Sequence, residues 1–251
     1  GEKLNFKINA NGIATEVSIL NGPIFKRRSP LSLTKKIFKI TPIKSIDELR
    51  KEAERSNPPL GNSKSEKFDL IEIKSIDKSI KYDIRYASEN NFMGSKFYKT
   101  SNAFLQRPAA EALKRVNEKL RSYGFGLLIH DAYRPWYVTK MFWDATPEDK
   151  KIFVANPQNG SRHNRGCAVD LTLYELSTGS PVEMVSGYDE FTERAFPYYY
   201  GGTTKQRSLR DLLRKNMESE GFSVYEYEWW HFDYKDWKKY GIGNLKFEDI
   251  K

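Results

Sequence analysis

Residues 161–170 read SRHNRGCAVD and combine a histidine and an aspartate with the start of a strand pattern. From Cys167 to Leu173, apolar side chains alternate with smaller or polar ones, which is typical of a strand with two different faces. Asp170 lies on the polar face, and His163 precedes the strand in a polar loop. The stretch therefore predicts two side chains suited to metal binding beside a buried strand.

A second segment, Glu228–His231, reads EWWH and supplies a carboxylate and an imidazole. A catalytic zinc needs three protein ligands from histidine and carboxylate groups, an open position for water, and a nearby base. The chain has three histidines and a single cysteine, Cys167, which excludes an internal disulfide and a cysteine-rich metal cluster. Together the two segments meet the requirements of a catalytic zinc site.

The spacing of the second segment raises a geometric question. Residues three apart in an ideal strand face opposite sides of the sheet, so Glu228 and His231 cannot both reach one metal from a regular strand. We therefore predict a bulge, a twist or a strand end at Trp229 and Trp230.

The remaining pattern beyond residue 67 mixes helices and strands. Apolar spacing predicts helices over 110–120, after Pro135 and over 209–217, and apolar or aromatic runs predict strands over 125–129 and 222–232. Strands and helices do not alternate regularly, so the sequence predicts the α+β class.

The first 66 residues differ in character, and we predict an accessory N-terminal extension over 1–66 followed by a catalytic domain over 67–251. Alternating apolar residues on both sides of Asn11-Gly12 predict a hairpin. Ser45 and Glu48 form the pattern of a capping box that opens a short helix. A polar linker is predicted to follow it.

Composition adds little about partners. The net charge is +9, but basic residues are interleaved with acidic ones and no nucleic-acid-binding motif accompanies them, so we expect a solvated basic surface and no nucleic acid partner. No run of eighteen apolar residues occurs, so we predict no transmembrane segment. Because the chain opens on Gly1, we expect an exported or periplasmic protein, with a cytoplasmic location as the alternative.

Three motifs, given in chain order, carry a resemblance to a known family: Asp-Ala-Tyr-Arg-Pro at 131–135, Ser-x-His-x-x-Gly-x-Ala-x-Asp at 161–170, and Glu-Trp-Trp-His at 228–231. They resemble the signature of the D-Ala-D-Ala dipeptidases of the VanX type, within the zinc D,D-peptidases that share a fold with the Hedgehog signalling domain. The resemblance extends from about Phe68 to the C-terminus. It implies a central, mainly antiparallel sheet with flanking helices.

The resemblance also implies the roles of five residues. His163, Asp170 and His231 correspond to the ligands of one zinc ion per chain. Glu228 corresponds to the general base and acid, and Arg134 to the group that stabilises the oxyanion. These roles agree with the chemistry of a carboxylate that moves a proton and a guanidinium that pairs with developing negative charge.

Three further residues, Tyr86, Ser161 and Asp189, are implied as substrate contacts. A free dipeptide carries an ammonium and a carboxylate only a few bonds apart, so a dedicated dipeptidase needs a fixed anion for the first group. Asp189 suits the ammonium, and Ser161 is expected at the carboxylate end.

Two other functions remain open at the level of the sequence. A D,D-carboxypeptidase or endopeptidase acting on peptidoglycan stems shares the metal site, although Trp229 favours the dipeptidase because the carboxypeptidase relatives more often resemble Glu-Pro-Trp-His there. A non-catalytic cell-wall-binding or signalling module is the third hypothesis, and the presence of all three ligands and the base argues against it. Oligomeric state and physiological role are not specified by the sequence.

Overall fold

The computed structural model describes residues 4–10, 14–19, 24–26, 39–59 and 65–250. The chain divides into two compact units, Gly1–Ile37 and Phe38–Lys251. This division falls earlier than the predicted boundary at residue 66, because helix α1 (Ile46–Glu54) packs against α4 (Trp136–Ala145) of the larger unit. Among the described residues, no helix is both long and apolar enough to cross a membrane.

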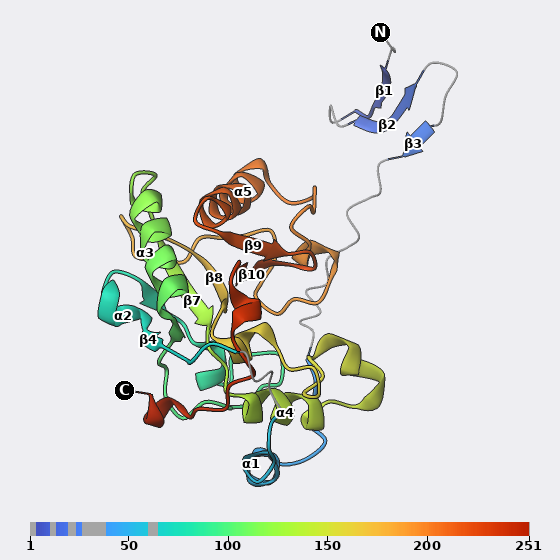
Figure 1. The fold of residues 1–251 in the computed structure, drawn as a ribbon. Helices are drawn as coiled ribbons and strands as arrows, with labels where there is room; N and C mark the ends of the chain where they lie inside the picture. The colour runs from blue at the N-terminus through green and yellow to red at the C-terminus, as the bar shows by residue number, and fades with distance from the viewer. Residues whose placement is uncertain (1–3, 11–13, 20–23, 27–38, 60–64, 251) are drawn as a thin grey trace. The chain divides into compact units, whose positions relative to one another are not determined.

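The small unit is a three-stranded antiparallel sheet of β1 (Leu4–Ile8), β2 (Ala14–Ile19) and β3 (Ile24–Lys26), in the order β1-β2-β3 (Figure 1). The predicted pairing of the first two strands is confirmed. Its turn signal, Asn11-Gly12, lies outside the described residues.

The larger unit contains short and long elements in an irregular order. In addition to α1 and α4 these are β4 (Leu70–Glu72), α2 (Ile73–Ile76), β5 (Lys81–Tyr82), η1 (Arg85–Ala87), β6 (Phe104–Gln106), α3 (Arg107–Arg121), β7 (Phe125–Asp131), η2 (Glu148–Phe153), η3 (Arg162–Arg165), β8 (Ala168–Glu175), η4 (Glu193–Ala195), α5 (Thr204–Ser219), β9 (Phe222–Tyr225), β10 (Glu228–Tyr234), η5 (Trp237–Lys239) and η6 (Phe247–Asp249). Ser45 caps α1 as predicted, because its side chain accepts a hydrogen bond from the Glu48 amide.

A five-stranded sheet forms the centre of the larger unit, in the order β5-β7-β8-β10-β9 (Figure 1). Strands β5 and β7 are parallel, and the other neighbours are antiparallel. Helix α3 packs against β7, and α5 packs against β9. The predicted α+β class with a mainly antiparallel sheet and flanking helices is confirmed.

Strand β8 is buried on both faces. Val169, Leu171 and Leu173 are fully buried in the main core, as their alternation predicts. The opposite face is also shielded, because Asp170 and Thr172 are only 3% and 5% exposed. The polar face of β8 therefore does not meet bulk solvent, and Asp170 is enclosed by other parts of the chain.

The aromatic stretch 222–232, predicted as one strand, is a hairpin of β9 and β10, so that prediction is wrong. Tyr225 pairs with Glu228, and only Glu226 and Tyr227 lie between them. The turn contains neither Gly nor Pro, and aromatic residues occur on both sides of it, so residue type does not reveal the break.

The predicted irregularity at Trp229 and Trp230 is confirmed. Glu228 pairs with Tyr225 while Phe232 pairs with Val224, so four steps along β10 correspond to one step along β9. Extra residues of this kind change which face a side chain occupies. The bulge therefore allows Glu228 and His231 to lie on the same side of the sheet.

Candidate active site

The loop before β8 holds His163 in a defined place. The His163 amide donates a hydrogen bond to the Ser161 hydroxyl, and the Asn164 side chain accepts one from the Ser161 amide. Together these two hydrogen bonds form a reciprocal cap on η3. Gly166 ends this turn at φ 68°, in the left-handed region. A side chain at Gly166 would also collide with Leu70, because a Cβ atom there lies 2.5 Å from Leu70 Cδ2.

The pairing of β8 with β10 brings the other two predicted ligands together. Asp170 lies directly opposite His231 in the antiparallel register. The Asp170 Oδ1 to His231 Nδ1 distance is 2.9 Å, and Asp170 Oδ2 lies 3.4 Å from His163 Nε2. All three residues are buried, and one ligand atom from each lies within 4.8 Å of the others. The structure thus assembles the predicted ligand set.

The protonation of both rings is set by their outer nitrogens. His163 Nδ1 lies 2.7 Å from the carbonyl oxygen of Ala132, which can only accept a hydrogen bond. His231 Nε2 lies 3.1 Å from Oδ1 of the Asp233 carboxylate. With protons on these outer nitrogens, the inner nitrogens, which lie 3.2 Å apart, are the atoms that can bind an ion.

This arrangement fits a metal ion. Oδ1 of Asp170 is buried and accepts no hydrogen bond from any residue that the structure describes, although it lies beside His231. Burial alone lowers the pKa of His231, but contact with Asp170 and Asp233 raises it well above its usual value. The site thus favours a positive charge between Asp170 and His231, which is a proton on Nδ1 of His231 when no ion is bound and a metal ion when one takes its place. Two imidazoles and a carboxylate form a donor set that zinc prefers, with room for a fourth ligand.

Glu228 lies at the edge of this group, as the bulge allows. Its Oε2 is 3.8 Å from His231 Nδ1. Its side chain remains 25% exposed, so water can reach the carboxylate. Burial raises the pKa of Glu228, and the neighbouring His231 opposes this effect. A carboxyl group with a raised pKa beside a metal site is suited to take up and release a proton.

Arg134 is buried beside Asp131. Its Nε and Nη2 atoms donate to Oδ2 of Asp131 at 3.0 and 2.7 Å, and Tyr98 donates to the other oxygen of that carboxylate at 2.7 Å. The guanidinium lies over the rings of Tyr86 and Phe142. Burial alone lowers the pKa of Arg134, but the Asp131 carboxylate raises it well above its usual value. Arg134 is therefore a fixed positive charge.

Among the non-glycine residues that the structure describes, Asp189 alone has a left-handed backbone, at φ 54°. Its Oδ2 accepts a hydrogen bond from the Tyr86 hydroxyl at 3.0 Å. Burial and the nearby carboxylates of Asp170 and Glu228 raise the pKa of Asp189 well above its usual value. A buried carboxyl group of this kind favours a cationic partner. The structure therefore brings Tyr86 and Asp189 together, and their contact with a substrate stays a prediction.

Ser161 has a structural role in addition to its predicted one. Its hydroxyl accepts the hydrogen bond from the His163 amide at 3.3 Å. A contact of Ser161 with substrate stays a prediction.

Sequence reasoning missed the residues that support the ligands. Asp233 orients His231 and is itself paired with Arg162, whose Nη1 lies 2.5 Å from Asp233 Oδ2. Tyr188 donates to Asp170 Oδ2 at 2.9 Å. A signal for Asp233 was present, because residues two apart in a strand share a face. No comparable signal existed for Tyr188, which comes from a loop distant in sequence.

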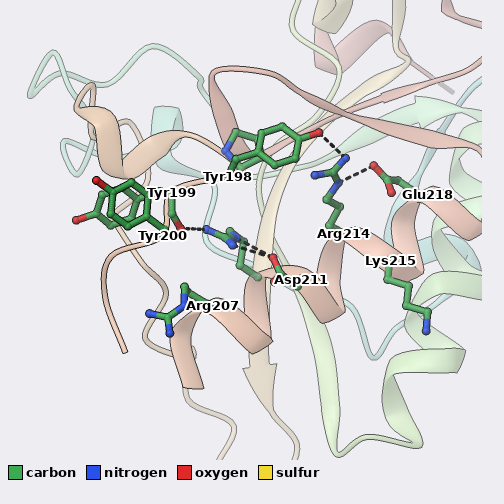
Figure 2. A pocket seen from close by; sticks show the side chains of 10 residues that line it. Tyr198, Tyr199, Tyr200, Arg207, Asp211, Arg214, Lys215 and Glu218 are labelled. Atoms are coloured by element: carbon green, nitrogen blue, oxygen red, sulfur yellow. Dashed lines mark hydrogen bonds and ion pairs between the residues drawn. The ribbon is translucent and has the colours of Figure 1, made fainter. Parts of the chain in front are cut away.

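One described hollow, of about 470 Å³, lies away from these residues, between α5 and the segment 197–200 (Figure 2). Its walls are held by internal pairs: Arg214 donates to Tyr198 Oη at 3.0 Å and to Glu218 Oε1 at 2.7 Å. None of the predicted site residues lines it. Arg214 therefore stabilises the surface around α5 through these hydrogen bonds.

A buried His-Asp-His group beside a partly exposed glutamate and a fixed arginine is characteristic of a metal-dependent hydrolase. Comparison with known families narrows this class. Residues 66–247 match the peptidase family model described as D-ala-D-ala dipeptidase, and the chain belongs to this family.

Individual relatives are similar over most of their length. The chain is 32% identical to the D-alanyl-D-alanine dipeptidase of Escherichia coli (strain K12), over 67% of this chain and 86% of the relative. It is 34% identical to the D-alanyl-D-alanine dipeptidase of Enterococcus faecalis, over 61% of this chain and 85% of the relative. Among solved structures, the LdcB LD-carboxypeptidase matches with a TM-score of 0.42 and 21% identity, over 69% of this chain and 72% of that one.

Proposed function

We propose that this protein hydrolyses the D-alanyl-D-alanine dipeptide in a zinc-dependent reaction. The observation that carries the proposal is the convergence of three lone pairs, from His163, Asp170 and His231, beside Glu228. Membership of the D-ala-D-ala dipeptidase family supports the choice of substrate.

His163, Asp170 and His231 would hold the zinc. Bound there, zinc would polarise the scissile carbonyl and lower the pKa of water toward neutrality. Glu228 accepts the proton of the attacking water and later donates it to the leaving amine. Its partial exposure gives access to water, and its raised pKa makes the return of the proton easier.

Arg134 stabilises the negative charge that develops on the carbonyl oxygen. Two of its nitrogens donate to Asp131, which holds the guanidinium in a fixed place beside the site. Asp131 and Tyr98 fix the guanidinium before substrate arrives, so little reorganisation is needed during the reaction.

Asp189 and Tyr86 bind the substrate ammonium. A neighbouring positive charge offsets the cost of ionising a buried carboxyl group, so Asp189 becomes an anion when the ammonium enters. Ser161 is assigned to the carboxylate end. This assignment requires a short substrate whose two charged ends are both recognised.

Hydrolysis by the zinc-loaded protein tests the proposal. We expect cleavage of D-Ala-D-Ala, no cleavage of L-Ala-L-Ala, and loss of activity after treatment with a chelator that zinc reverses. Preference for a pentapeptide stem over the free dipeptide would instead support a D,D-carboxypeptidase. Failure to cleave either substrate in the presence of bound zinc would overturn the proposed activity.

A further inference from the structure

Tyr188 connects the loop that carries Asp189 to a predicted metal ligand. Its hydroxyl oxygen lies 2.9 Å from Asp170 Oδ2 and 3.2 Å from the hydroxyl oxygen of Tyr86. A tyrosine hydroxyl has one proton to donate. The carboxylate is the closer partner and the stronger acceptor, so Tyr188 donates to Asp170.

The two oxygens of Asp170 therefore have different environments. Oδ2 is held by the Tyr188 hydroxyl, whereas Oδ1 is buried without a hydrogen bond from the described residues. Oδ1 is also the oxygen that lies 2.9 Å from His231 Nδ1. A carboxylate restrained in this way presents one free oxygen to an ion at the position where the imidazole lone pairs converge.

Packing fixes the Tyr188 ring. It makes edge contacts with Trp230, at a centroid distance of 5.6 Å, and lies 4.9 Å from the His130 ring. These contacts hold the hydroxyl in place beside Asp170.

The neighbouring Tyr86 uses its own proton elsewhere, because it donates to Asp189 Oδ2 at 3.0 Å. With each hydroxyl donating to a different carboxylate, no proton remains for a hydrogen bond between Tyr188 and Tyr86, whose oxygens lie 3.2 Å apart. The contact of Tyr188 with Asp170 is therefore independent of Tyr86.

We propose that Tyr188 is a positioning residue of the metal centre. Its hydroxyl holds Oδ2 of Asp170 so that Oδ1 faces the ion. This inference rests on the proposed zinc-dependent function. Removal of a group that orients a metal ligand typically weakens metal binding by about 10–100-fold.

Zinc affinity tests the inference independently of catalysis. The full chain and its Tyr188→Phe variant compete for zinc against a chromogenic chelator. Tyr188→Phe keeps the packed ring and removes only the hydroxyl, so we expect its zinc dissociation constant to rise by about 10–100-fold. Equal zinc affinity in Tyr188→Phe and the parent protein would overturn the inference.

Two variants serve as controls. Tyr174→Phe removes a hydroxyl from β8, the strand that carries Asp170; this hydroxyl donates to the Ser79 carbonyl at 2.8 Å and not to a ligand. Tyr86→Phe removes the neighbouring hydroxyl, which donates to Asp189, but leaves the Tyr188–Asp170 hydrogen bond. We expect zinc affinity unchanged in both, and an equal loss in Tyr174→Phe would show a general effect on the fold and overturn the inference.

A spectroscopic measurement separates this inference from the proposed function. In the cobalt-loaded protein, a change in the orientation of Asp170 alters the ligand-field absorption, so we expect Tyr188→Phe to shift these bands and Tyr174→Phe to leave them unchanged. Identical cobalt spectra in all three proteins would contradict the role of Tyr188. A parent protein that binds neither zinc nor cobalt would instead overturn the proposed function itself.

Discussion

His231 and Asp233 lie two positions apart on β10, and Nε2 of the imidazole is 3.1 Å from Oδ1 of the carboxylate. The alternation of side chains along a strand places both on one face. The contact fixes the ring and leaves Nδ1 as the atom that would bind the proposed zinc.

Replacement of Asp233 should therefore weaken metal binding. We expect Asp233→Asn to raise the zinc dissociation constant by about 10–100-fold, because the amide no longer fixes the protonated nitrogen of His231. Competition with a chelator measures the change. Asp236→Asn is the matched control, since Asp236 lies nearby but pairs with Lys239. Unchanged affinity in Asp233→Asn would contradict the assigned tautomer.

Glu228→Gln should separate proton transfer from metal binding. The amide cannot accept the proton of the attacking water, so we expect kcat to fall by about 10²–10⁴-fold while one zinc per chain is retained. Steady-state hydrolysis of D-Ala-D-Ala and metal analysis provide the two measurements. Glu226→Gln, in the exposed turn of the same hairpin, should behave as the parent. If Glu228→Gln retains full activity, another residue is the base.

Arg134→Lys keeps the positive charge but loses the forked geometry. A lysine cannot hold Asp131 through two nitrogens and also reach the oxyanion, so we expect kcat to fall by about 10²–10³-fold. The loss should appear in kcat more than in KM, because the missing contact forms in the transition state. A variant with raised KM and normal kcat would place Arg134 in substrate binding instead.

Asp189→Asn should affect recognition of the free amine. The parent protein is expected to cleave D-Ala-D-Ala much faster than N-acetyl-D-Ala-D-Ala, because only the first substrate offers a cation to Asp189. In the variant this preference should largely disappear, with KM for the free dipeptide raised. Competition between the two substrates measures the preference. An undiminished preference would assign the ammonium to a different residue.

His130 should make stability dependent on pH. Burial, aided by the nearby Arg85, lowers the pKa of His130 to about 4 from its ordinary value of 6.5. As pH falls below 6.5, the imidazole of His130 binds a proton in the unfolded chain but not in the folded protein. The free energy of unfolding therefore decreases between pH 6.5 and pH 4, by about 3 kcal/mol.

Unfolding in denaturant at several pH values checks this prediction. His130→Asn lacks the titrating group, so its stability should fall less steeply than that of the parent protein between pH 6.5 and 4. Parallel curves for the two proteins would show that His130 takes up its proton in the folded state at an ordinary pH.

Features that depend on neighbouring residues along the chain could be predicted without a structure. The period of two in 167–173 predicted β8 and its buried face, and Ser45 with Glu48 predicted the start of α1. The same reasoning showed that Glu228 and His231 need an irregular strand, because the alternation of side chains is a local property of the backbone. The sequence did not predict the turn at Glu226 and Tyr227, because aromatic residues occur throughout 222–232.

The site is completed by contacts between segments that lie far apart in the sequence. His163 and His231 are 68 positions apart, and it is the pairing of β8 with β10 that brings their inner nitrogens to 3.2 Å. The Ala132 carbonyl and the Tyr188 hydroxyl reach the ligands from other segments. Contacts of this kind depend on how sheet and loops pack in three dimensions, and no spacing along the chain encodes them.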